Sequence, residues 1–352
     1  MANVAANSIA VAYEGQYAAK MLLEPMFHSD EIMNNYTIYP NVKYKQNVFL
    51  ANSLRGITEL NEGCSDDSCT PSTFDVDDKV ITTANVAVKL EQCWKEFYDE
   101  FIVESYKNGI NMPDLTGTQL ANVILDRVRS GIQSDVVRNM WGGDTDVADD
   151  CTYSWTDGLF KTFNAGGISV GTGTTGAVPG SPLYTTTSSV LPGGDGATLL
   201  DAVWQQASAD LQQIPANEKR IFVSPNVYNN YYASLTLVGQ TGAVDYGHSE
   251  VQSGVNYTSL RFRGVEVVPM YEWDTIFTGY NPTIWDIGGT DYKQGAIYAA
   301  KANLMIGSDV SNPENELKMF YDPISDKMYI RSYFTMGYQY GWNSLVSAST
   351  LV

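Results

Sequence analysis

The chain has 352 residues, of which 44% are hydrophobic and 17% are charged, a composition typical of a folded globular protein rather than a disordered one. Its net charge is −19 and its densest basic stretch is only Lys43-Tyr44-Lys45, so we expect no free binding to nucleic acid. No window of about 18 apolar residues occurs, so we expect no membrane-spanning helix. No basic residue precedes Lys20, so we expect no secretory signal peptide.

The first part of the chain predicts an arm followed by a hairpin. Residues 1–40 contain short apolar pieces without a long period, as an extended arm would. Residues 41–82 contain two alternating stretches, NVKYKQNVFL and FDVDDKVI, around the polar tip NEGCSDDSCTPST. The alternation predicts one apolar face and one charged face, with lysines placed to pair with aspartates across strands or between chains. The apolar face includes Val42, Tyr44, Phe74 and Val76, and the charged residues include Lys43, Lys45, Asp75, Asp77 and Asp78.

Two helices are predicted next. Residues 86–107 carry an apolar stripe and are followed by Gly109, which fits a helix end. Residues 117–141 predict a longer helix, since Thr116 and Gln119 match a capping box and Gly142 ends the pattern. About 25 helical residues span roughly 37 Å, enough for a structural spine. Apolar residues recur along it at every fourth position: Leu120, Ile124, Val128, Ile132, Val136 and Met140.

The remainder predicts a mixed body and, with it, the fold class α+β. Residues 144–197 are rich in Gly, Thr and Pro and have little periodicity. A helix is expected to begin at Asp195 or Thr198, followed by a strand over 220–224 and a helix that opens at Pro225. Further strands are expected in LRFRGVEVVPM, AIYAAKANLMIG and LKMFYDPISDKMYIRSYFTMGYQYGW.

Two catalytic patterns overlap in GGISVGTGTTG. Residues 167–171 match G-x-S-x-G, the nucleophile elbow of serine hydrolases, with Ser169 as the nucleophile. Residues 171–176 match the dinucleotide fingerprint G-x-G-x-x-G. Both mechanisms need a helix directly after the motif, and Pro179 and Pro182 oppose one. We therefore interpret the segment as a loop or loose strand and expect no catalytic residue and no cofactor, with His248 as a weak partner for the hydrolase alternative.

An acidic cluster and four cysteines raise the question of metal binding. Asp144, Asp146, Asp149 and Asp150 supply oxygens that suit Ca²⁺ but lack the spacing of an EF-hand, so a solvated or interface cluster is favoured and cation binding stays open. Two thiols, Cys64 and Cys69, without histidine partners do not make a zinc site. Their redox state stays open as well, and we expect no metal ion.

The last quarter of the chain carries a family resemblance. The segment AIYAAKANLMIGSDVSNPENELKMFYDPISDKMYIRSYFTMGYQYGW contains K-x-N-L-x-x-G-x-D, here beginning at Lys301, and RGVEVVPMYEWDT precedes it. Together with the order of arm, hairpin, long helix and mixed body, these residues resemble the major capsid proteins of tailed bacteriophages with the HK97-type fold. They are similar in particular to those of phages that infect Bacteroidetes-type hosts.

The resemblance implies a domain organisation and a function. The function is that of a major capsid protein, which assembles itself into the icosahedral shell that encloses the phage genome. Two alternatives are kept: another virion protein, such as a tail-associated or glycan-binding one, and a serine hydrolase. The implied parts are an N-arm (1–40), an E-loop hairpin (41–82), a P-domain (83–197) with a spine helix (117–141), an A-domain (198–312) and C-terminal strands that return to the P-domain (313–352).

The implied partners are chiefly other copies of the chain. Hexamers and pentamers are expected, together with a portal, decoration proteins and packaged DNA that is nearby without sequence-specific binding. No long scaffold segment precedes the arm, so a separate scaffolding protein is expected, and no Lys–Asn crosslink. The location is the virion shell, and the host cytoplasm during assembly. The candidate contacts between subunits are Val42, Lys43, Tyr44, Lys45, Phe74, Asp75, Val76 and Asp77.

Overall fold

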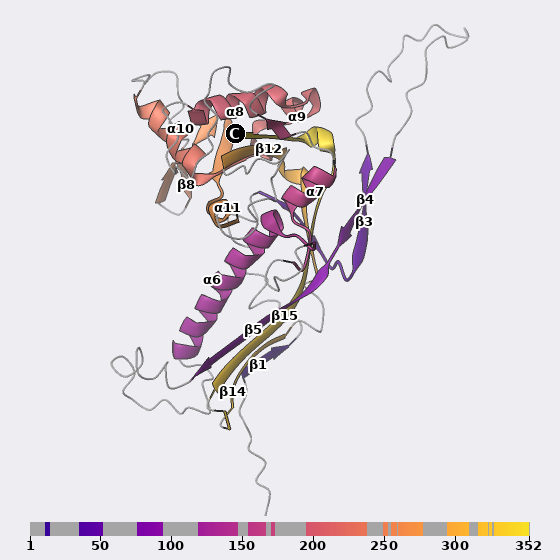
Figure 1. Ribbon diagram of the computed structural model, residues 1–352, viewed down its shortest axis with the longest axis vertical. Helices are drawn as coiled ribbons and strands as arrows, with labels where there is room; N and C mark the ends of the chain where they lie inside the picture. Colours follow the sequence, from indigo (N-terminus) through magenta and orange to yellow (C-terminus); the bar gives the residue numbers. More distant parts are fainter. Residues whose placement is uncertain are drawn as a thin grey trace, which may run out of the picture.

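The structure is a computed structural model, and Figure 1 shows its arrangement: two sheets with helices beside them and a hairpin that projects to one side. In the part of the chain that the structure describes, no helix is both long and apolar enough to cross a membrane. The described residues are 11–14, 35–51, 76–93, 119–146, 154–166, 170–172, 195–237, 249–252, 255–258, 260–276, 294–309, 316–322, 324–325 and 327–351.

A first sheet is organised around one long strand, β15, which is bordered by β14 and β13 on one side and by β5 on the other. Its order among the described strands is β1-β14-β15-β13-β2, with β5 also paired to β15. All pairs are antiparallel except β2 with β13. The strands are β1 (Val11–Glu14), β2 (Thr37–Pro40), β5 (Ala84–Cys93), β13 (Leu304–Ser308), β14 (Glu316–Asp322) and β15 (Lys327–Tyr340).

The second sheet has the described order β10-β11-β7-β12-β16-β6 and mixes parallel and antiparallel pairs. The turn between its first two strands places Arg263 and Gly264 at φ of 49° and 84°, which suits a tight hairpin turn. The strands are β6 (Val170–Thr172), β7 (Lys219–Val223), β10 (Arg261–Phe262), β11 (Val265–Pro269), β12 (Gln294–Ala300) and β16 (Val346–Leu351).

Helices cover these sheets. The long helix α6 (Gln119–Gly142) lies along β5 and β15 (Figure 1), while α8 (Asp195–Gln206) and α10 (Pro225–Leu237) share a buried cluster with the second sheet. The shorter helices are α7 (Leu159–Ala165), α9 (Ala209–Gln213), α11 (Tyr271–Thr275), and the 3-10 turns η3 (Ala216–Glu218), η5 (Lys301–Asn303) and η6 (Asn343–Leu345). The helix expected over 117–141 is thus present as α6, and Val128, Ile132, Val136 and Met140 of its stripe are buried.

The helix predicted over 86–107 is wrong in its first part. Residues 84–93 form β5, which pairs with β15 over ten registered positions from Cys93–Lys327 to Ala84–Met336. Exposed Asn85, Ala87 and Lys89 alternate with half-buried Val86 and Val88, the period of a strand. The long-range ladder with β15 therefore outweighs the local helical stripe. Residues 94–107 lie outside the described residues.

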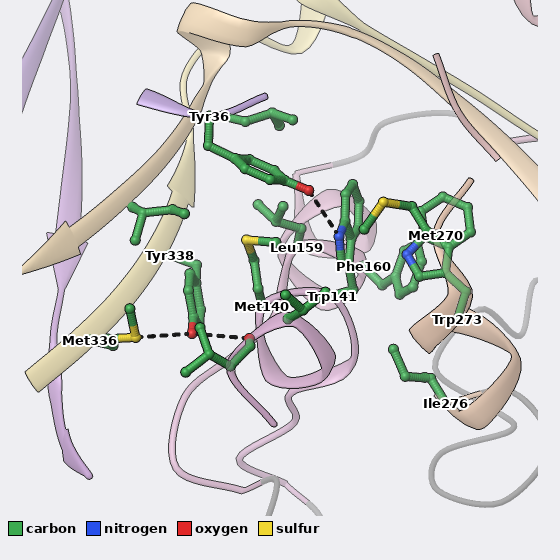
Figure 2. Close-up of a cluster of buried hydrophobic side chains, with 14 of the residues drawn as sticks. Tyr36, Met140, Trp141, Leu159, Phe160, Met270, Trp273, Ile276, Met336 and Tyr338 are labelled. Atoms are coloured by element: carbon green, nitrogen blue, oxygen red, sulfur yellow. Dashed lines mark hydrogen bonds between the residues drawn. The ribbon is translucent and has the colours of Figure 1, made fainter. Parts of the chain in front are cut away.

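One hydrophobic cluster joins the two sheets. It includes Ile330 and Phe334 from β15, Phe222 from β7 and Ile297 from β12. Figure 2 shows its aromatic part, where Trp141 of α6 lies among Tyr36, Phe160 and Trp273. The indole Nε1 of Trp141 donates a hydrogen bond to Tyr36 Oη at 3.2 Å, and the Trp141 and Trp273 rings meet edge to face at 5.0 Å. This cluster thus lies between the two sheets, while the second sheet also contributes to the separate cluster with α8 and α10.

Two small antiparallel ribbons lie outside these sheets. One is β8 (Ser249–Gln252) with β9 (Val255–Thr258). The other is β3 (Lys45–Ala51) with β4 (Val76–Thr82), the hairpin expected within residues 41–82. It projects from the body beside β15 (Figure 1), and its tip, residues 52–75, lies outside the described residues.

Candidate assembly interface

The β3–β4 hairpin has an inner face that is seated on its own subunit. Ile81 is completely buried, and a side chain at Gly307 of β13 would collide with it. The amide of Gln339 on β15 donates a hydrogen bond to the Val80 carbonyl at 3.1 Å, and the backbone N–H of Thr83 donates to the Tyr44 carbonyl at 2.9 Å. These contacts fix the base of the hairpin on β13 and β15.

The outer face of the hairpin is apolar and exposed. Phe49 is 74% exposed, Val76 52% and Val80 37%. The register places Phe49 opposite Asp78 and Asn47 opposite Val80, so these side chains lie on one face of the ribbon. An isolated two-stranded ribbon is marginal in water, and such a face needs a covering surface.

The sequence-predicted contact residues divide into three groups. Lys43, Tyr44, Lys45, Val76 and Asp77 are exposed as a contact surface requires, and Tyr44 is 67% exposed. Phe74 and Asp75 lie outside the described residues. Val42 is buried to 1% exposure by its own subunit, and its backbone N–H donates to the Ser308 carbonyl at 3.1 Å, so it leaves the set of candidates.

The expected pairing of lysines with aspartates inside the hairpin is wrong. Lys45 lies opposite Thr82 at the base, whereas Asp77 lies opposite Leu50 near the tip. The amide of Asn47, not a lysine, donates to Asp78 at 3.4 Å. Within strands β3 and β4, no lysine thus lies opposite an aspartate. Phe49 was missed because NVKYKQNVFL places it among the polar positions, and only the pairing with β4 reveals its face.

The acidic segment after α6 is organised by a lysine. Lys161 Nζ of α7 lies 2.6 Å from Asp144, 2.8 Å from Asp146 and 2.9 Å from Asp157. Burial alone would lower the pKa of Lys161, but its hydrogen bonds to the three carboxylates outweigh burial and hold that pKa above its ordinary value. Burial alone would raise the pKa of Asp157, but hydrogen bonds from Lys161 and Thr145 hold it below its ordinary value.

The lysine therefore occupies the position that a cation would take between these carboxylates. Asp149 and Asp150, the other members of the predicted cluster, lie outside the described residues. Within the described ranges, no group of three or more His, Cys, Asp or Glu side chains is arranged to hold a metal ion. Asp144, Asp146 and Lys161 instead tie α6 to α7.

Comparisons with known proteins rest on structure alone. No family model and no curated protein matches the chain. A chain of the procapsid of satellite phage P4, a structure that includes the size-determination protein Sid, matches with a TM-score of 0.58 at 11% identity over 94% of this chain and 90% of that chain. Structures from Mycobacterium phage Cain and Microbacterium phage Oxtober96 match with a TM-score of 0.48 each, at 10% and 11% identity. They cover 100% and 91% of this chain and 94% and 90% of theirs.

The chain has the HK97-type capsid fold. The match to the P4 procapsid chain covers 94% of this chain. The fold class expected from the sequence, α+β with an HK97-like order of elements, is confirmed.

Most residues of the two catalytic patterns lie outside the described residues. Gly171 lies in β6, a short strand that pairs in parallel with β16. Ser169, Gly173, Gly176 and His248 lie outside the described residues, as do Cys64 and Cys69. The interpretation of the segment as a loop or loose strand without a catalytic role stays a prediction.

Proposed function

We propose that this chain is a major capsid protein that assembles into the icosahedral shell around a phage genome. The observation that carries the proposal is the capsid fold over nearly the entire chain. The exposed apolar face of the β3–β4 hairpin supports it, because a shell subunit must bury such a surface on its neighbours. A structural rather than enzymatic role fits both observations.

The proposal assigns parts to the elements. The hairpin within 41–82 is the E-loop, α6 is the spine helix of the P-domain, residues 198–312 form the A-domain, 1–40 form the N-arm and 313–352 return to the P-domain. The hairpin contacts a neighbouring copy through its outer face. Phe49, Val76 and Val80 are the proposed contact residues on the outer face. Lys43, Tyr44, Lys45, Phe74, Asp75 and Asp77 are proposed as further contacts around it, with Asp77 on the opposite face of the ribbon.

The proposed partners follow from the same function. Copies of the chain form hexamers and pentamers, and a portal, a separate scaffolding protein and decoration proteins complete the particle. The packaged DNA lies inside without sequence-specific contacts, as the net charge of −19 favours. The protein is located in the virion shell, and in the host cytoplasm while shells assemble.

Electron microscopy and sedimentation velocity of the purified chain, with a scaffolding protein where one is needed, test this function. The parent should form closed shells. Phe49→Asp should remain folded by circular dichroism and stay as small oligomers, since it puts a charge on the apolar face. Gln206→Asp, which adds the same charge on an exposed position of α8, is the control and should assemble. A parent that remains a small oligomer under all conditions would contradict the capsid function and favour the tail-associated or hydrolase alternatives.

A further inference from the structure

Two glycines lie opposite each other in the first sheet, directly beneath the base of the β3–β4 hairpin. Gly307 of β13 and Gly337 of β15 are registered partners. A side-chain carbon at Gly307 would lie 2.7 Å from Cγ2 of Ile81, and one at Gly337 would collide with the carbonyl oxygen of Thr82. Glycine inside a strand often marks the close approach of another backbone. The hairpin thus crosses the sheet at the pair of β13 and β15 positions that has no side chain on either strand.

Beyond this crossing, the hairpin follows the end of β15. Two residues after Gly337, the side-chain amide of Gln339 donates a hydrogen bond to the Val80 carbonyl at 3.1 Å. Just past the end of β15, a side-chain carbon at Gly341 would lie 3.3 Å from Leu50 of β3. Three successive contacts along β15 therefore set the direction of the hairpin, and at two of them a glycine leaves the space that the hairpin occupies.

Two residues of the K-x-N-L-x-x-G-x-D motif build this seat. Gly307 is the glycine of the motif and Asn303 is its asparagine. The Asn303 carbonyl accepts a hydrogen bond from the Gly341 N–H at 3.0 Å. Its buried side chain donates to the Trp342 carbonyl at 2.9 Å and accepts from the Trp342 N–H at 2.7 Å. One motif residue thus fixes the turn after β15, and the other leaves room for the hairpin.

A small displacement at this seat changes the direction of the whole hairpin. The step from Gly337 to Gly341 is four residues, or about 13 Å of strand. Raising the base of the hairpin by about 1 Å over that length tilts the hairpin by about 4°. In a closed assembly every copy repeats the same contact, so a constant tilt accumulates from copy to copy. The tilt therefore affects whether the assembly closes and at what diameter.

We infer that Gly307 and Gly337 are positioning residues for assembly, which set the direction of the hairpin and, through it, the curvature of the shell. The inference rests on the proposed shell function and adds what fixes the geometry of the hairpin contact. It also separates the two glycines. An added carbon at Gly307 meets the side chain of Ile81, whereas one at Gly337 meets the backbone of Thr82. Only the second clash has to be relieved by moving the hairpin itself.

Two matched double variants test this distinction, with Ile81→Leu alone as the baseline. Gly307→Ala with Ile81→Leu removes the methyl group that meets the new carbon and keeps the volume, so its shells should have the parental diameter in electron microscopy. Gly337→Ala with Ile81→Leu leaves the Thr82 carbonyl in place. Its subunits should be folded by circular dichroism and should give shells of altered diameter, or a yield of closed shells at least tenfold lower. Parental shells from this variant, or equal losses from both, would overturn the inference.

A third variant covers the case in which the Gly337 variant fails to fold. Gln339→Met has a similar size, adds no clash with the hairpin and removes the hydrogen bond to the Val80 carbonyl. The direction of the hairpin is then held less tightly, so the distribution of shell diameters should become at least twice as broad. A distribution as narrow as that of the parent would overturn the inference. If Phe49→Asp still abolished shells in that case, the proposed shell function would stand without the positioning role.

Discussion

The contact between Gly337 and Thr82 is the point where the hairpin is most sensitive to a single methyl group. In Gly337→Ala the new Cβ would lie 2.1 Å from the Thr82 carbonyl oxygen and 2.8 Å from its carbonyl carbon. A carbon and a carbonyl oxygen approach to about 3.3 Å at closest, so the hairpin base must retreat by about 1 Å. Neighbouring Ile81 is completely buried and resists that shift.

The expected cost is that of overpacking, about 1–3 kcal/mol. Gly131 offers a matched control, because it lies within α6 and an added side-chain carbon would meet nothing within 4 Å. Gly131→Ala should stabilise the subunit by about 0.5–1 kcal/mol, since alanine is the better helix former. The same substitution should therefore have opposite signs at the two positions.

Thermal unfolding of unassembled subunits, followed by circular dichroism, measures both effects. Gly337→Ala should lower Tm by a few degrees and Gly131→Ala should raise it slightly. Particle yield gives a second readout, because a displaced hairpin base moves the outer face that we propose to contact a neighbour. A Gly337→Ala subunit with the parental Tm and a normal yield of shells would refute the seating of the hairpin described above.

Three further predictions concern the body of the subunit. Val128→Pro should cost about 3 kcal/mol or more, because proline removes a hydrogen bond and clashes within α6, and an unchanged melting temperature would contradict the helix. Tyr36→Phe should cost about 1–3 kcal/mol in urea unfolding, since the indole N–H of Trp141 loses its buried acceptor. In the parent, the ion pairs of Lys161 should stabilise the subunit between about pH 4 and about pH 10. Asp157 stays ionised above this lower limit because its pKa is lowered, and Lys161 stays protonated below the upper limit because its pKa is raised. Lys161→Met should be less stable than the parent at pH 7, and the difference should shrink as the pH falls below about 4 and the carboxylates become protonated. A Tm difference that stays constant from pH 7 to about pH 2 would contradict the ion cluster.

Local patterns in the sequence were sufficient for the hairpin and for α6. Each element has its own period: a period of two places Val76 and Val80 together on the exposed outer face of the hairpin, and a period of four places Val128 and Ile132 on the buried face of α6. The strand β5 could not be found this way, because its conformation depends on β15, which follows it by more than two hundred residues. A helical stripe in residues 86–107 was therefore misleading.

The sequence likewise predicted only part of the candidate interface correctly. Val42 was placed on the exposed face because strict alternation was continued toward Asn41, whose φ of 68° breaks the strand and turns Val42 into the core. Phe49 was missed because its face is defined only by the register with β4.

The last strand of the first sheet continues directly into the second. β15 ends at Tyr340, η6 follows, and β16 then pairs with β12. If the chain forms a shell filled with DNA, internal pressure stretches the wall, and this unbroken length of backbone would carry tension from one sheet to the other. The ladders that flank β15 would be loaded in shear, with many hydrogen bonds resisting together. Pulling single subunits from the two ends of β15–β16 should then give one high-force rupture, and an early, separate rupture of each sheet would show that the load is not shared.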